Sequence, residues 1–220
     1  MRNMDEAATS GAMFPGLGFW TAILAAALTA VYIGLLGFLM LTGDTLPPDE
    51  PLQTILHILI LLCLPVFVFL WVLIHDSAPM DRKIFSLASV AFIAIFAALV
   101  AVNRFVALTV EPQGLALGKT AGLAWFMPYE WPSVMLAIEM LGWGFFFGLA
   151  WLSAATVFQE GALEKTIFWT LVITALLNLA SSVPLVINQF NWIGLVAPLA
   201  WGLGPIAAFI LIAIWFHRQA

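Results

Sequence analysis

Two charged side chains, Arg104 and Glu139, stand within otherwise apolar stretches of the sequence. A charge in lipid is costly, so each needs a partner or a function. A guanidinium can donate two parallel hydrogen bonds to one carboxylate, which offsets much of the cost of removing both groups from water. The possible chemistry is therefore an ion pair between helices, recognition of a small ligand, or proton binding by Glu139 if Arg104 turned away.

Further polar side chains are expected to face the interior of the bundle. Thr170, Thr174, Asn178 and Ser181 recur at steps of four, four and three residues, which places them on one helical face. Asn178 and Ser181 fall in the outer half of this face, where the two charges are expected. His57 and Asn103 fall in the outer half of their own apolar runs. The predicted ligand-binding set is Arg104, Glu139, Asn178, Asn103, Ser181 and His57.

Three interpretations of this polar region remain open. The preferred functional hypothesis is the binding or passage of a small amphipathic molecule through an outward-facing polar pocket, because apolar walls with a few convergent polar groups are typical of ligand sites. Its predicted cap is Trp125, Phe126, Tyr129 and Trp131. The first alternative is a structural or accessory membrane subunit in which the Arg104–Glu139 pair only joins helices. The second alternative is an intramembrane enzyme that uses Glu139 or His57 on a lipid-like substrate.

Familiar catalytic and cofactor motifs are absent from the sequence. It has no Gly-x-Ser-x-Gly, His-Glu-x-x-His, Gly-x-x-x-x-Gly-Lys or Cys-x-x-Cys segment, so an enzyme is not favoured and no catalytic residue is assigned. We expect no metal and no cofactor, because the three histidines, His57, His75 and His217, fall on opposite sides of the membrane. The single Cys63 cannot form an intrachain disulfide.

The composition requires lipid as the solvent of this chain. Of its 220 residues 64% are hydrophobic and 9% are charged, whereas a soluble domain has about 25% charged residues. The mean hydropathy is +1.08. A net charge of −5 with seven scattered basic residues argues against a nucleic-acid partner. The lipid bilayer is the expected partner, with a small amphipathic ligand as a possible second one.

Six apolar runs are long enough to cross a bilayer as helices. They cover residues about 18–41, 54–74, 84–110, 132–157, 166–187 and 192–216. No run alternates with the period of a membrane barrel, so the backbone must satisfy its hydrogen bonds within helices. The predicted fold class is an all-α polytopic membrane protein, with one six-helix bundle domain over residues 1–220.

The links and the basic residues predict the topology. The short link at 188–191 makes the last two helices antiparallel neighbours, and the apolar link at 111–131 is expected to lie on the interface or to fold back over the bundle. Five basic residues fall on one side against Lys119 on the other, which predicts that both termini are cytoplasmic. These five are Arg2, Arg82, Lys83, Lys165 and Arg218. The layout is that of many small multi-pass proteins of the bacterial or archaeal cytoplasmic membrane.

This topology places the two intramembrane charges at the same depth. Arg104 lies about six residues before the outward end of the third span and Glu139 about seven after the outward start of the fourth, which is roughly 9–11 Å for each. Consecutive helices usually pack side by side. We therefore predict that Arg104 and Glu139 touch. Gly144 and Gly148 form a small-residue row that is interpreted as helix packing.

Overall fold

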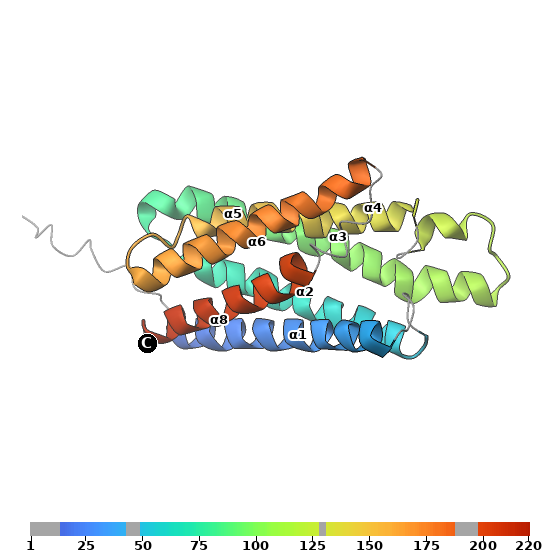
Figure 1. Cartoon of the computed structure of the whole chain (residues 1–220), viewed down its shortest axis with the longest axis horizontal. Helices are drawn as coiled ribbons and strands as arrows, with labels where there is room; N and C mark the ends of the chain where they lie inside the picture. The colour runs from blue at the N-terminus through green and yellow to red at the C-terminus, as the bar shows by residue number, and fades with distance from the viewer. Residues whose placement is uncertain (1–13, 43–48, 128–130, 188–197) are drawn as a thin grey trace, which may run out of the picture.

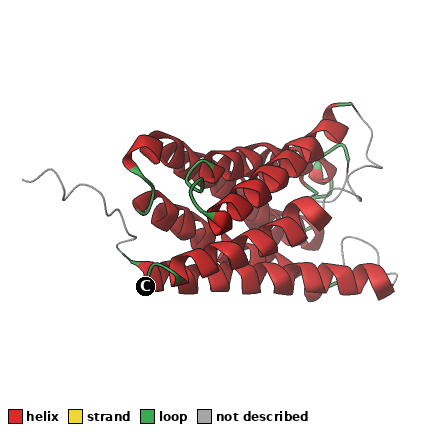
Figure 2. Cartoon of the chain, turned by 60° about the vertical axis from the view of Figure 1, so that its left-hand side comes forward, coloured by secondary structure: helices red, strands yellow, loops and turns green. Residues whose placement is uncertain are grey.

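The computed structural model describes residues 14–42, 49–127, 131–187 and 198–220, and this part of the chain consists of helices joined by turns and loops, with no strand (Figures 1 and 2). Six helical segments are long and apolar enough to span a membrane, which confirms the predicted fold class. They are Pro15–Leu39, Leu52–Asp76, Met80–Ala116, Val134–Ala155, Ala162–Val186 and Leu199–His217. Helices are the open-chain structure that satisfies every backbone polar group within lipid.

The spans form one antiparallel bundle. Helix α1 (Pro15–Thr42) lies beside α8 (Gly204–His217), and the rings of Phe19 and His217 are 5.5 Å apart (Figure 1). The start of α1 and the end of α8 therefore share one end of the bundle, which we call the terminal end; the other is the distal end. That the terminal end faces the cytoplasm stays a prediction.

Helix α3 (Lys83–Ala116) continues beyond its apolar run. The sequence predicted a span that ends near residue 110, and the structure corrects this because a helix needs apolar residues only inside the bilayer. The helix stops where Gly118 adopts a left-handed φ of 65°, and Lys119 N donates to Gly114 O at 2.9 Å. Part of the predicted link is thus helical, and it projects from the distal end (Figure 1).

The fourth span is interrupted at its centre. It consists of α4 (Val134–Met140), the π-helical segment η4 (Leu141–Phe146) and α5 (Phe147–Ala155). A second π-helical segment, η6 (Pro198–Leu203), precedes α8. The periodicity of the sequence predicted neither interruption. The predicted link at 188–191 and the first residues of the predicted sixth span lie outside the described residues.

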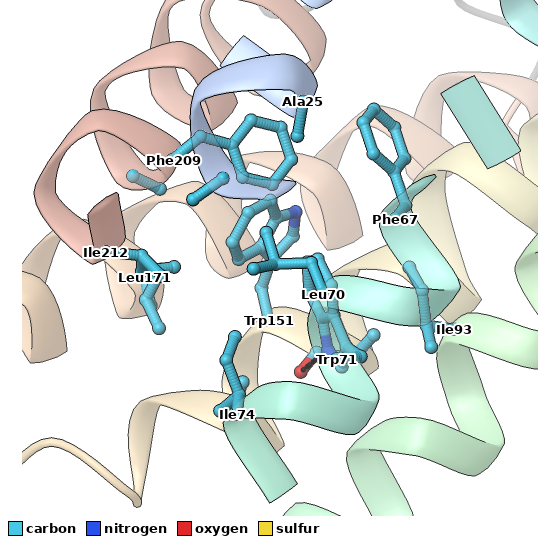
Figure 3. Packing of buried hydrophobic residues seen from close by; sticks show 14 of the residues in the cluster. Ala25, Phe67, Leu70, Trp71, Ile74, Ile93, Trp151, Leu171, Phe209 and Ile212 are labelled. Carbon is cyan, nitrogen blue, oxygen red and sulfur yellow. Dashed lines mark hydrogen bonds between the residues drawn. The ribbon is translucent and has the colours of Figure 1, made fainter. Parts of the chain in front are cut away.

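A buried aromatic cluster holds the bundle together. The ring centroid of Trp151 in α5 lies 4.6 Å from that of Trp71 in α2 (Leu52–Asp76) and 5.3 Å from that of Phe209 in α8 (Figure 3). The indole N–H of Trp71 donates to Ser89 Oγ at 2.6 Å, and Ser89 Oγ donates to Ala150 O at 2.6 Å. The hydroxyl of Ser89 therefore bridges neighbouring helices in the terminal half of the bundle.

The glycine row of the fourth span, predicted to serve helix packing, packs against α6 (Ala162–Val186). A Cβ atom on Gly144 would overlap Ser182 Oγ and lie 3.2 Å from Asn178 O. A Cβ on Gly148 would lie 2.9 Å from Leu179 and 3.1 Å from Ala175 O. These glycines therefore allow two backbones to approach closely, as small residues do in membrane bundles.

We expect Gly144→Ala to lower the free energy of unfolding by about 1–3 kcal/mol, the usual range for overpacking a closed contact. Gly37→Ala is the matched control, because it also lies in a helix and nothing lies within 4 Å of its added Cβ. Unfolding in mixed micelles would measure both. Equal stabilities of the two variants would contradict the close contact of η4 with α6.

Candidate functional site

Arg104 and Glu139 touch in the structure, as predicted. Arg104 Nη2 donates to Glu139 Oε1, and the two residues are only 3% and 6% exposed. Arg104 lies on α3 and Glu139 on α4, which are neighbours in the distal half of the bundle (Figure 1). The pair therefore joins two consecutive spans across their contact.

His57 of α2 completes this contact on the other side of Arg104. Arg104 Nη1 lies 3.2 Å from His57 Nδ1, and His57 is 1% exposed. An arginine can only donate hydrogen bonds, so His57 Nδ1 accepts, and a neutral ring then carries its proton on Nε2. The guanidinium thus divides its donors between a carboxylate and an imidazole. The expected arrangement, with two parallel hydrogen bonds to one carboxylate, is not the one observed.

Trp143 of η4 is a site residue that sequence reasoning missed. Its Nε1 donates to Glu139 Oε1 at 2.7 Å, so one carboxylate oxygen accepts from both Trp143 and Arg104. The other oxygen, Glu139 Oε2, is buried without a hydrogen-bond partner among the described residues. The spacing Glu-x-x-x-Trp places both side chains on one helical face, and this was the available signal. We name Arg104, Glu139, His57 and Trp143 the charged network.

Asn103 bonds to the backbone at the start of the fourth span. Its Nδ2 donates to Met135 O at 2.7 Å, and the residue is fully buried. Ser133 Oγ caps the same helix by accepting from Leu136 N at 3.0 Å. Asn103 and the cap therefore fix the helical turn that precedes Glu139. Asn103 thus helps to position Glu139 by bonding to the backbone and not to its carboxylate.

Two polar side chains of α6, Asn178 and Ser182, donate to backbone carbonyls in or beside the two π-helical segments. Asn178 Nδ2 donates to Ala200 O in η6 at 2.9 Å and to Thr174 O at 2.7 Å. Pro205 lies five residues after Ala200 and has no N–H, so the amide of Asn178 supplies a donor that the chain lacks there. Ser182 Oγ donates to Met140 O, just before η4, at 3.4 Å.

Ser181 bonds within its own helix. Its Oγ donates to Asn178 O at 2.6 Å. The six predicted site residues thus divide into two groups. Arg104, Glu139 and His57 form a direct contact, whereas Asn103, Asn178 and Ser181 bond to backbone carbonyls.

The two π-helical segments meet at a pair of tryptophans. The ring centroids of Trp143 in η4 and Trp201 in η6 are 6.2 Å apart. Both rings line a cavity of about 10 Å³ together with Thr29 and Cys63, which is room for about one water molecule. One member of the charged network, Trp143, thus lies within a π-helical segment, and such segments are often found at functional sites.

A third buried charge, Glu111, lies farther toward the distal end. It is 7% exposed, and its Oε1 accepts from Gln53 Nε2 of α2 at 3.5 Å. The sequence placed Glu111 in a link because the apolar run stops before it. Its position seven residues after Arg104 puts the two on one face of α3, which is the signal that could have found it.

The predicted aromatic cap is only partly described. Trp125 and Phe126 belong to η3 (Leu123–Phe126) and are exposed, as is Trp131, while Tyr129 lies outside the described residues. Trp131 lines a surface groove of about 440 Å³ between the fourth span and α6. This groove contains neither Arg104 nor Glu139, although Met140 and Leu141 in its wall directly follow Glu139.

No grouping of three His, Cys, Asp or Glu side chains suited to a metal ion occurs in the described parts of the chain. No protein-family model, curated protein or solved structure matches this chain significantly. The arrangement of the charged network therefore carries the functional argument.

Proposed function

We propose that this multi-pass membrane protein is a structural or accessory membrane subunit, in which the charged network joins three spans in the distal half of the bundle. The observation that carries the proposal is the closed contact of Arg104 with Glu139 and His57 at exposures of 6% or less. Each of the three groups has at least one partner inside the protein. A ligand would have to compete with each of these contacts.

The physical chemistry favours a joining role. Arg104 on α3 contacts α2 through His57 and the fourth span through Glu139, so one guanidinium connects three helices. Within lipid an unpaired charge is far more costly than a paired one, so the bundle is held in the arrangement that keeps the pair closed. Two further hydrogen bonds hold Glu139 in this position. Asn103 donates to Met135 O, before Glu139 in the chain, and Trp143 donates to the Glu139 carboxylate itself.

A second candidate function is the binding of a small amphipathic molecule. The groove of about 440 Å³ favours it, because its wall is apolar apart from Ser182 and runs beside the turn that follows Glu139. The volume lies within the range of small-ligand sites, about 300–1,000 Å³. Ser182 is the polar side chain of this wall that such a ligand could engage.

A thermal-shift screen distinguishes the two functions. Lipids and amphipathic amines would be tested on the wild type and on an Arg104→Leu/Glu139→Leu double variant, whose apolar pair keeps the helix contact without charge. A compound raises the melting temperature when it binds the folded protein and not the unfolded chain. If the pair only joins helices, its removal takes away no binding site, so we expect the same shifts for both proteins. A compound that stabilises only the wild type would contradict it and favour the amphipathic ligand.

A matched variant in the groove separates these outcomes further. Ala137→Phe would obstruct the groove from its wall without touching the charge pair. If an amphipathic compound stabilises the wild type and the double variant but not Ala137→Phe, it binds the groove independently of the charges. The joining role of the pair then stands, and the ligand site is a separate property.

A further inference from the structure

The terminal end of the bundle carries a polar cavity of about 610 Å³, remote from the charged network. It opens to the surface, and its lining comes from the turn before α3, the link between α5 and α6, and the end of α8. Its charged lining consists of Arg82, Arg218, Asp81, Glu160 and Glu164, with Trp215 at its apolar wall. The cavity therefore combines both signs of charge beside an apolar surface.

Some of these charges are already engaged. Arg82 Nε pairs with Asp81 at 2.8 Å. The carboxylate of Glu164 lies against Gly161, whose φ of 92° begins α6, and an acidic group there is stabilised by the N-terminus of the helix. Among the described residues, no hydrogen bond or ion pair engages the side chain of Arg218 or that of Glu160. One guanidinium and one carboxylate thus remain available to a ligand.

The cavity lies at the depth expected for lipid head groups. Trp20 near the start of α1 and Trp169 near the start of α6 are 68% and 61% exposed, and exposed tryptophans mark the membrane–water interface. Both helices begin at the terminal end (Figure 1). A head group of the adjacent leaflet can therefore reach the cavity while its acyl chains stay in the bilayer.

We propose that this cavity binds a phospholipid head group that carries both a phosphate and a primary ammonium. Arg218 donates to the phosphate, as guanidinium groups do in phosphate sites, and Glu160 accepts from the ammonium. The lining holds two guanidinium groups and three carboxylates, so a purely anionic head group gains less than a zwitterionic one. The proposal does not depend on the role of the charged network.

The test is retention of defined lipids by the purified full-length protein, measured by native mass spectrometry. Phosphatidylethanolamine should be retained on the order of tenfold over phosphatidylcholine, the discrimination of one charge-assisted hydrogen bond, since a trimethylated ammonium cannot donate. Phosphatidylglycerol, which has the phosphate without an amine, should be retained less than phosphatidylethanolamine. Equal retention of either competitor would overturn the proposal.

Two substitutions of exposed residues test which side chains bind the ammonium and the phosphate. Glu160→Gln should abolish the preference for ethanolamine over choline, and Arg218→Gln should lower the retention of both lipids. Lys119→Gln at the distal end is the control and should change neither. Both test residues are exposed, so melting temperatures should stay at the wild-type value. Unchanged lipid retention in Glu160→Gln and Arg218→Gln would overturn the assignment.

A soluble head group separates the two possible sources of this chemistry. Glycerophosphoethanolamine offers the same phosphate and ammonium without acyl chains. Failure of this compound at millimolar concentration to displace the lipid supports a membrane-anchored ligand, because chains held in the bilayer raise its effective concentration. Full displacement would show that the cavity takes a free zwitterion, and it would overturn the lipid as the ligand.

Discussion

Replacing Arg104 by leucine is expected to lower the free energy of unfolding by about 3–5 kcal/mol, because Glu139 would remain as a buried charge without its cation. Glu139→Leu is expected to destabilise by a similar amount, since it strands the guanidinium of Arg104 at 3% exposure. His57 cannot compensate for the lost carboxylate, because its Nδ1 already accepts from Arg104. Unfolding in mixed micelles with increasing anionic detergent measures both changes.

The double variant Arg104→Leu/Glu139→Leu should recover most of the lost stability, to within about 1 kcal/mol of the wild type, because buried pairs can be replaced by apolar side chains at little cost. Arg82→Leu is the matched control. It removes an arginine from an exposed pair with Asp81, whose side chain is 70% exposed, and such pairs contribute at most about 1 kcal/mol. If neither single variant is less stable than Arg82→Leu, the joining role of the pair is wrong.

Truncation of Trp151 to alanine should destabilise the bundle by about 3–5 kcal/mol, the usual range for a large aromatic side chain in a closed core. Trp151 is fully buried, and its ring centroid lies 4.6 Å from Trp71, 5.2 Å from Phe147 and 5.3 Å from Phe209. It lies at the centre of the cluster in Figure 3, so its removal takes contacts from several helices at once. Packing contacts of this kind drive helix association in lipid.

Two variants make this prediction specific. Trp151→Phe keeps an aromatic ring and removes an indole N–H that has no hydrogen-bond partner among the described residues, so it should cost less than about 1.5 kcal/mol. Trp169→Ala removes the same side-chain type from a position 61% exposed and should change stability little. Equal losses for Trp151→Ala and Trp169→Ala would show that the aromatic cluster does not hold the bundle together.

Much of the fold could be predicted because lipid imposes simple rules. Each run of about 20 apolar residues must be a helix, and this placed the six spans within a few residues in most cases. The errors occurred where a helix continues beyond the end of its apolar run. Helix α3 continues to Ala116 because helical hydrogen bonds do not require apolar side chains, and Gly118 ends it.

The central contact of the candidate site could also be predicted. Two charges at one depth on consecutive spans have few partners other than each other, so Arg104 and Glu139 were expected to meet, and they do. The roles of Asn178 and Asn103 could not be predicted in this way. They bond to Ala200 O and Met135 O, and which backbone carbonyls lie within reach depends on how the helices are rotated and packed.

The sequence by itself determined the membrane class, the six spans, the small-residue row of the fourth span and the pairing of the two intramembrane charges. These follow from the cost of unpaired polar groups in lipid, which acts on each segment locally. Tertiary packing decided the π-helical turns at η4 and η6, the insertion of His57 and Trp143 into the charged network, and the burial of Glu111. Those features depend on which side chains of other helices lie opposite a given residue. The local spacing of Trp143 and Glu111 places them on the right helical faces, but it does not show that another helix buries them there.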